Sequence, residues 1–172
     1  MKYLFILILA ITISSCKKPD EYPIIPAISF SKILITKDAQ GFDQSFSVVL
    51  DFTDGDGDIG YKQLNENGPP YDTPGSEYYN NYKGVLYHYS NGNWIAVPFS
   101  PPVEGRIPYL TPEGKNKALK GQIQFDQLVI FLPAIISEPV VNDTFRVEVF
   151  IYDRGLHKSN KVTTPNFTLN VQ

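Results

Sequence analysis

The sequence predicts an all-β protein built as an antiparallel β-sandwich. Aromatic residues make up 13% of the chain and charged residues only 19%, while proline and glycine, at 14 and 12 copies, supply frequent turns. Aromatic residues are enriched in strands, and closely spaced turn formers suit short strands better than long helices. No segment has a helical pattern longer than two turns.

The first 15 residues have the layout of a secretory signal. Lys2 provides a positive start, Tyr3 to Ile13 form an apolar stretch of 11 residues, and two serines precede Cys16. A positive start, an apolar middle and small residues before a cleavage site are typical of an exported precursor. A helix that crosses a bilayer needs about 20 apolar residues, so we expect cleavage and not a transmembrane span.

The four residues Ile13-Ser14-Ser15-Cys16 resemble the lipobox of bacterial lipoproteins. That family prefers Leu at the first of these positions and Gly or Ala at the third, so Ile13 and Ser15 depart from its pattern. The resemblance implies cleavage before Cys16, acylation of its thiol (palmitate among the acyl chains) and attachment to the outer membrane. Two or more acyl chains make such an anchor stable. The alternative is an ordinary signal that leaves a free cysteine.

Residues 16–26 are expected to be the lipidated cysteine and an extended tether, and residues 27–172 the sandwich domain. The charged tract 16–21 also resembles the one that follows the lipidated cysteine in surface-exposed Bacteroidetes lipoproteins, with a plain solvated linker as the equal alternative. Loss of Lys2 moves the net charge from −3 to about −4. This mild acidity, without a basic cluster, argues against a nucleic-acid partner. After Cys16 no cysteine remains, so disulfides cannot stabilise the domain.

The first half of the domain shows three strand signals. Apolar residues between 27 and 35 indicate a first strand with an irregularity near Ser31 and Lys32. Residues 45–52 place an apolar side chain at every second position, the period of a half-buried strand. Residues 65–81 are rich in Pro, Gly, Asn and Tyr and indicate a loop. Residues 83–97 indicate a hairpin that turns at Asn91-Gly92.

The second half continues the pattern. Residues 98–118 contain many prolines and suggest one short strand near 106–110, and residues 121–132 indicate one long strand or a strand pair. Residues 143–152 alternate strictly, and a polar turn at 153–160 precedes a last strand at 166–171. About seven strands without intervening helices predict a sandwich of the immunoglobulin or fibronectin type.

Three aspartates alternate with glycine where the strand 45–52 ends. Asp54, Asp56 and Asp58 repel one another unless a cation lies between them or some are protonated. Hard oxygen ligands suit Ca²⁺, which takes 6 to 8 oxygens. An EF-hand is excluded because Ile59 and Asn65 stand where that motif needs Gly and Glu. The sequence therefore predicts a calcium loop at a sandwich tip, with an unoccupied acidic turn as the alternative.

A second loop is expected at the same end of the sandwich. In an immunoglobulin-like plan, the loops after the strands 45–52 and 143–152 emerge at one pole. Asp153 and Asn160 are therefore candidate calcium ligands, and Arg154 could pair with a surplus carboxylate. An ordinary surface turn at Asp153-Arg154 is the equal alternative.

The runs 52–60 and 153–160 together resemble uncharacterised Bacteroidetes lipoproteins that share a "DGDGDIG" loop and a late "DRxLxKSN" segment. This resemblance covers most of the mature chain. Gly155 and His157 differ from the Ala and Asn expected there. The resemblance implies location and fold but no reaction.

Aromatic side chains are dense between residues 71 and 94. Aromatic platforms bind sugar rings by stacking, although such residues more often cover a sheet or pack a loop. No nucleophile, phosphate-binding or zinc motif is present, and His88 and His157 lack partners at ligand spacing. We therefore expect a non-enzymatic, calcium-stabilised binding or structural module at the cell envelope, or else a glycan-capturing accessory protein. The candidate platform residues are Tyr78, Tyr79, Tyr82, Tyr87, Tyr89 and Trp94.

Overall fold

The structure of the chain is a computed structural model that describes residues 21–99, 102–110 and 117–172. The predicted signal at residues 1–15 and the lipidated Cys16 lie outside the described residues. Among the described helices, none has the length and apolar character needed to cross a membrane.

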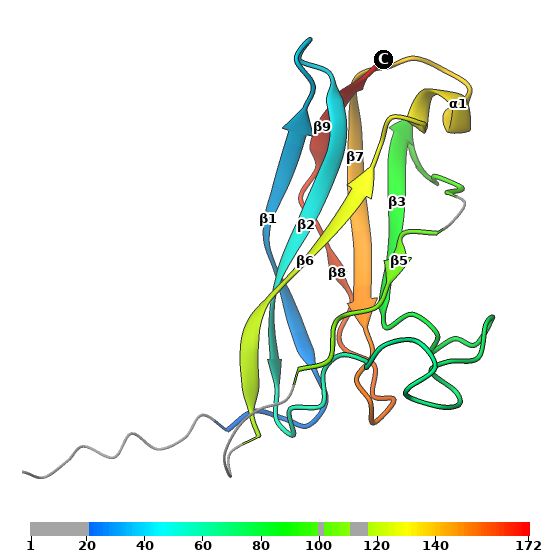
Figure 1. The fold of residues 1–172 in the computed structure, drawn as a ribbon. Coiled ribbons are helices and arrows are strands. Elements are labelled where there is room, and N and C mark those ends of the chain that lie inside the picture. Colours follow the sequence, from blue (N-terminus) through cyan, green and yellow to red (C-terminus); the bar gives the residue numbers. More distant parts are fainter. Residues whose placement is uncertain (1–20, 100–101, 111–116) are drawn as a thin grey trace, which may run out of the picture.

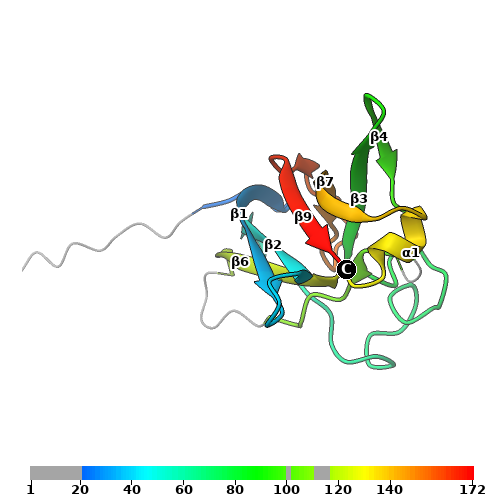
Figure 2. The ribbon, with the colours of Figure 1, turned by 90° about the horizontal axis from the view of Figure 1, so that it is seen from above.

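Two antiparallel sheets make up the fold, and their strands run along the long axis of the molecule (Figure 1). Figure 2, seen along that axis, shows the two layers and the β3–β4 hairpin that projects from the second. The first sheet has the order β1-β2-β6, with bounds Ala27–Lys37, Asp43–Asp54 and Leu119–Leu128. The second has the order β4-β3-β7-β8, with β5 on β3 and β9 on β7. The bounds in this sheet are β3 Tyr82–Ser90, β4 Asn93–Ala96, β5 Glu104–Gly105, β7 Val140–Ile151, β8 Val162–Thr163 and β9 Phe167–Val171.

This arrangement confirms the predicted all-β sandwich. The first two long strands share one sheet, and the next long strand, β3, crosses to the other and pairs with β7 near the end of the chain. That exchange of strands between sheets is the connectivity of immunoglobulin-like sandwiches. The β4 strand extends the second sheet as a hairpin partner of β3.

The core lies between the inner faces of β2 and β7. In β2 the alternate side chains Phe46, Val48 and Leu50 are fully buried, as the period-two pattern predicts. The β7 strand contributes a matching buried row. Because a strand turns successive side chains to opposite faces, one sequence pattern fixes both the inner and the outer surface. The buried row of β7 consists of Phe145, Val147, Val149 and Ile151.

Several local predictions are confirmed and others are corrected. The β1 strand has its register shift between Phe30 and Lys32, and the hairpin turns at Asn91-Gly92, both with positive φ. Residues 121–132 are not a strand pair: β6 is one strand, and a short helix, α1 (Leu132–Ile136), follows it. The strand expected at 106–110 is wrong, because the structure has only β5 and an isolated bridge from Pro108 to Tyr61. Proline has no N–H to donate, which limits that segment to short pairings.

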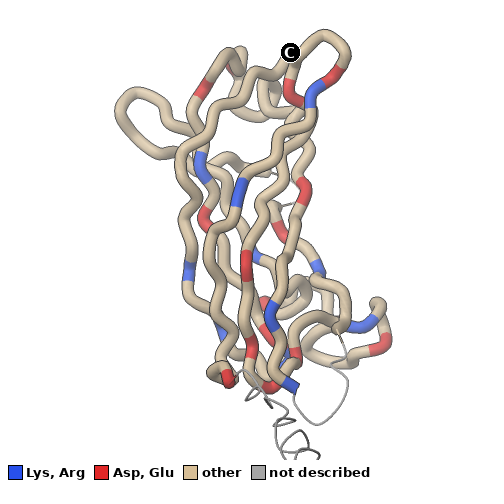
Figure 3. Tube along the Cα trace, turned by 90° about the vertical axis from the view of Figure 1, so that its left-hand side faces the viewer, with Lys and Arg blue, Asp and Glu red and all other residues tan. Residues whose placement is uncertain are grey.

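The loops after β2 and β7 lie at one pole of the sandwich, together with residues 21–26 (Figure 1). The chain ends at the opposite pole, beside α1 (Figure 1). Acidic positions lie along the whole molecule, and several of them are at the loop pole together with basic ones (Figure 3). The pole that carries the acidic loop is therefore also the pole at which the described chain begins.

Candidate functional site: an acidic pole, a cleft and an aromatic face

The acidic loop begins on the last residue of β2. Asp54 is still paired with β6 and is fully buried, while Asp56 is exposed and Asp58 half-buried. The loop then curls back because Gly57 and Gly60 have φ of +69° and +86°, a region that glycine enters without steric cost. As a result, one oxygen from each of the three carboxylates lies within 4.8 Å of the others.

Two of these carboxylates carry buried oxygens without a partner. Oδ2 of Asp54 accepts a hydrogen bond from the backbone N–H of Asp58 at 2.8 Å. Oδ1 of Asp54 and Oδ1 of Asp58, both buried, have no hydrogen-bond donor in the described part of the chain. A buried carboxylate oxygen without a partner is costly, so these two atoms are left to be satisfied by something else.

The raised pKa values of the loop carboxyls also indicate negative charge that is not neutralised. Burial raises the pKa of the Asp54 carboxyl to about 6, and the charges of Asp56, Asp58 and Asp153 add to the rise. Burial also raises the pKa of Asp58, and the charges of Asp153 and Asp56 raise it further. The charge of Arg154 and the backbone N–H of Gly155 offset only part of this rise. Negative charge is therefore concentrated here beyond what the neighbouring side chains neutralise.

Asp153 joins the same cluster from the β7 loop, as expected, but its oxygens are occupied. Asp153 is fully buried and accepts from the backbone N–H of His157 at 2.8 Å through Oδ1. Its Oδ2 lies 2.9 Å from Nδ1 of the same histidine. This hydrogen bond raises the pKa of His157. In this conformation Asp153 contributes its negative charge to the cluster, while both of its oxygens already contact His157.

Asn160 and Arg154 have roles that the sequence did not suggest. The Asn160 amide accepts from the N–H of Ile28 and donates to the Ile28 carbonyl, both at 2.8 Å. Asn160 therefore holds the start of β1, and we leave it out of the calcium ligands. Among the described residues Arg154 makes no ion pair, although its charge opposes the rise in the pKa of Asp58. Its guanidinium donates to the carbonyls of Ile59 and Gly60 at 3.0 and 2.9 Å. It thereby fixes the C-terminal end of the acidic loop.

The segment before β1 lies against the acidic loop. The N–H of Gly55 donates to the carbonyl of Pro23 at 2.8 Å. A Cβ on Gly55 would lie only 2.2 Å from the Tyr22 carbonyl oxygen, so only glycine fits. The tether expected at 16–26 is therefore in contact with the domain over the part that the structure describes.

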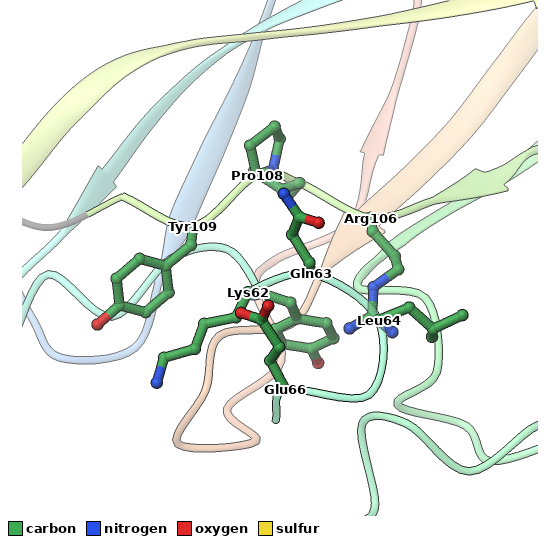
Figure 4. A pocket seen from close by; sticks show the side chains of 9 residues that line it. Lys62, Gln63, Leu64, Glu66, Arg106, Pro108 and Tyr109 are labelled. Atoms are coloured by element: carbon green, nitrogen blue, oxygen red, sulfur yellow. The ribbon is translucent and has the colours of Figure 1, made fainter. Parts of the chain in front are cut away.

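A shallow cleft of about 620 Å³ opens beside the acidic loop (Figure 4). The segments 61–66 and 106–109 form its walls, and Lys62, Glu66 and Tyr109 line it. A second hollow shares these three residues and extends to Arg154. Strand-pattern reasoning missed this cleft, because its walls are irregular segments brought together by the fold.

Arg106 holds the long loop that forms one side of the cleft. Its Nη1 donates to the carbonyls of Tyr71 and Tyr79, each at 2.8 Å, and its Nη2 to Asp72 at 3.1 Å. Its guanidinium also lies 5.0 Å from the centre of the Tyr61 ring. Arg106 is thus an anchor for the loop and not a free cation.

The predicted aromatic platform is not one surface. Tyr82 is 1% exposed and stacks on Phe125 in the core. Tyr79 lies beside Arg106, and Tyr78 packs on Tyr152. The remaining three residues, Tyr87, Tyr89 and Trp94, come from the outward face of β3 and β4.

That outward face continues onto β7. Arg146 lies directly across from Tyr87 in the β3–β7 register, and its guanidinium carbon is 4.3 Å from the centre of the Trp94 ring. Phe150 lies further along the same face of β7, under Lys158. Tyr87 and Phe150 line a groove of about 340 Å³ on this face. We refer to Tyr87, Tyr89, Trp94, Arg146 and Phe150 as the aromatic face.

Comparison with known proteins adds no relative: no family model, no curated protein and no solved structure matches this chain.

Proposed function

We propose that this protein is a membrane-anchored lipoprotein of the cell envelope whose acidic pole binds calcium and which acts as a non-catalytic binding or structural module. The observation that carries the calcium proposal is the pair of buried oxygens on Asp54 and Asp58 that have no hydrogen-bond partner among the described residues. Ca²⁺ bonds to oxygen at 2.3–2.6 Å, so two of its ligands are at most about 5 Å apart. The 4.8 Å limit within the three carboxylates meets that condition.

The donor set favours calcium over softer metals. Asp54, Asp56 and Asp58 offer only hard oxygen ligands, and no cysteine remains beyond Cys16. Bound calcium would neutralise the three carboxylates and satisfy the two buried oxygens. It would also fix the loop against Pro23, next to the point where the chain leaves for its anchor. In a domain without disulfides, such an ion supplies the cross-link that covalent bonds do not.

Thermal melting of the mature chain, residues 16–172, tests this function. At calcium concentrations about a hundred times the Kd, binding adds about 2.7 kcal/mol to the free energy of unfolding. For a domain of this size that corresponds to a rise in Tm of roughly 5–10 °C over chelator. Magnesium at the same concentration serves as the control and should raise Tm less, because it prefers a rigid octahedral site. Equal midpoints in calcium and in chelator would remove the calcium site.

The anchor is part of the same proposal and rests on the sequence. The 11-residue apolar stretch, the serines and Cys16 support export followed by acylation. Acyl chains on Cys16 would hold the acidic pole near the outer membrane, since the described chain begins at that pole (Figure 1).

A second candidate function is capture of glycans by the aromatic face. The observation that favours it is the placement of Tyr87, Tyr89 and Trp94 on one outward face, with Tyr89 46% exposed. Exposed ring faces stack on the CH surfaces of sugars. Retention on immobilised glycans tests it: a chain that no glycan retains does not have this function.

A further inference from the structure

On the aromatic face, Arg146 lacks a carboxylate partner among the described residues, whereas two neighbouring lysines have one. Lys83 and Lys161 also lie beside the groove, and each has a carboxylate, Glu104 at 2.8 Å and Glu148 at 3.0 Å. Arg146 has no carboxylate partner within the described ranges, and its buried Nε has no hydrogen-bond acceptor there.

Two aromatic rings hold the Arg146 guanidinium in place. Its central carbon is 4.3 Å from the centre of the Trp94 ring and 5.5 Å from that of Tyr87. Cation–π contacts of this kind restrict the planar group. Its two Nη groups, which are not among the buried unpartnered atoms as Nε is, remain as donors for a ligand. A guanidinium with a fixed orientation is suited to a planar anion such as a carboxylate, which accepts two parallel hydrogen bonds.

A second ring-supported cation stands at the other end of the face. The Lys158 ammonium lies 3.8 Å from the centre of the Phe150 ring and is without a carboxylate partner in the part of the chain described. Arg146 and Phe150 are four residues apart on β7, or roughly 13 Å at 3.3 Å per residue. The groove that is lined by Tyr87 and Phe150 is also lined by Glu77, Glu104 and Glu148, whose carboxylate oxygens can accept hydrogen bonds from sugar hydroxyl groups.

We propose that the aromatic face binds an acidic polysaccharide, with Arg146 and Lys158 each taking a carboxylate of the polymer and the exposed ring of Tyr89 contacting its sugar rings. This inference rests on the second candidate function, glycan capture, and names its ligand class. An acidic polysaccharide carries carboxylates at repeated positions, and these can reach the two separated cations, Arg146 and Lys158. Lys83 and Lys161 neutralise Glu104 and Glu148. The carboxylate oxygens can still accept hydrogen bonds from hydroxyl groups, which a polysaccharide carries and poly-glutamate lacks.

Trp94 makes the proposal directly measurable, because it is the one tryptophan in the chain. The mature chain, residues 16–172, is titrated at low salt with oligogalacturonate, with a neutral oligoglucan of equal length and with poly-glutamate. We expect oligogalacturonate to change Trp94 fluorescence and to bind at least tenfold more tightly than either of the others.

Variants assign the binding to the named side chains, with calorimetry as a second readout because Arg146 itself affects the Trp94 signal. Arg146→Gln should weaken oligogalacturonate binding at least tenfold, and Lys158→Gln severalfold. Lys32→Gln makes the same charge change on β1, in the other sheet, and should leave binding within twofold. A melting curve on each variant confirms that it is folded.

Each contrary result has a distinct meaning. Equal binding of the neutral oligoglucan, or an unchanged affinity in Arg146→Gln, would overturn the acidic ligand while leaving glycan capture in place. Equal binding of poly-glutamate would indicate an acidic protein partner and overturn the proposal. Failure of both sugars to bind would overturn the acidic-polysaccharide proposal, while glycan capture itself is tested by retention on immobilised glycans. The calcium site is tested separately, by the shift in Tm.

Discussion

Asp54 is the residue on which the calcium proposal depends, and its substitution separates two effects. In Asp54→Asn the amide oxygen can still accept from the Asp58 N–H, while one negative charge is removed from the cluster. Without calcium we expect the variant to be more stable than the wild type, by about 1–3 kcal/mol, because a buried charge and its repulsion are gone. With calcium the rise in Tm seen for the wild type should be lost.

The matched control is Asp51→Asn, an exposed carboxylate on the same strand whose Oδ1 accepts from Gln122. It should leave both the calcium-free Tm and the calcium shift unchanged within experimental error. A calcium shift of wild-type size in Asp54→Asn would show that the ion, if bound, is held elsewhere.

The raised pKa values predict how the calcium-free protein responds to pH. The pKa of Asp54 is about 6 in the folded chain and about 4 when unfolded, so between these values the folded state binds more protons. The free energy of unfolding should therefore increase as pH falls from 7.5 to 5, on the order of 1–2 kcal/mol. His157, whose pKa is raised by Asp153, acts in the same direction.

Melting curves in chelator-treated, calcium-free buffer measure this response. With calcium present the gain on acidification should disappear, because the ion and the protons compete for the same carboxylates. A calcium-free Tm that falls steadily from pH 7.5 to 5 would contradict the assignment of a buried, protonatable cluster.

At the scale of the elements, Asn160 joins the loop after β7 to the beginning of β1. Asn160→Ala removes both hydrogen bonds to Ile28 and should cost about 1–3 kcal/mol of unfolding free energy. Because the contact is structural, the loss should be equal in calcium and in chelator. A loss that appears only with calcium would return Asn160 to the ligand set.

The long loop 55–81 has no strand of its own within its span and depends on Arg106. Arg106→Lys keeps the charge but cannot donate to Tyr71, Tyr79 and Asp72 at once. We expect proteolytic cleavage within residues 62–80 to become about tenfold faster, as local opening of the loop becomes easier. Lys62→Gln, which changes an exposed cation on the same loop, is the control and should be cleaved at the wild-type rate.

Apolar residues at every second position predict much of the fold. The same alternation also predicts on which face of the sheet each side chain lies, which the grouping of the tyrosines did not use. Alternation through Leu86 places Tyr82 on the inner face and Tyr87 and Tyr89 on the outer one, which is what the structure has. Grouping the tyrosines by sequence density, without regard to face, put Tyr82 wrongly in a surface platform.

Other parts of the site have no local signal. The Asn160–Ile28 contact joins residues 132 positions apart, and the Gly55–Pro23 contact depends on how the tether approaches the loop. Arg106 lies in a segment whose proline pattern is irregular, and its three acceptors come from a loop with no periodicity. Such contacts are set by tertiary packing, so the sequence indicated the acidic loop and not the residues that hold it.

For the whole molecule, the proposed anchor predicts a simple partition. Full-length wild-type precursor expressed in a bacterial host should be acylated, should incorporate labelled palmitate and should enter the detergent phase of a phase-separating detergent. Cys16→Ser removes the acceptor thiol and should remain in the aqueous phase without label. If both proteins remain equally in the aqueous phase, residues 1–16 direct export without lipidation.

The anchor and the acidic pole together suggest one arrangement of the molecule. The described chain begins beside the acidic loop and ends at the far pole, so a lipid on Cys16 would place the calcium loop toward the membrane and the C-terminal pole away from it (Figure 1). The aromatic face, on the side of the sandwich, would remain accessible from outside.

Calcium binding measured directly is the closest test of the central claim, that the clustered aspartates coexist because a divalent ion neutralises them. The experiment is a calorimetric titration of Ca²⁺ into the chelator-stripped mature chain, compared with Asp54→Asn. We predict one ion per chain with a Kd in the range of extracellular calcium modules, about 10⁻⁴–10⁻³ M or tighter, and no binding in the variant. A titration without saturable heat in the wild type, or with the same isotherm in Asp54→Asn, would contradict it.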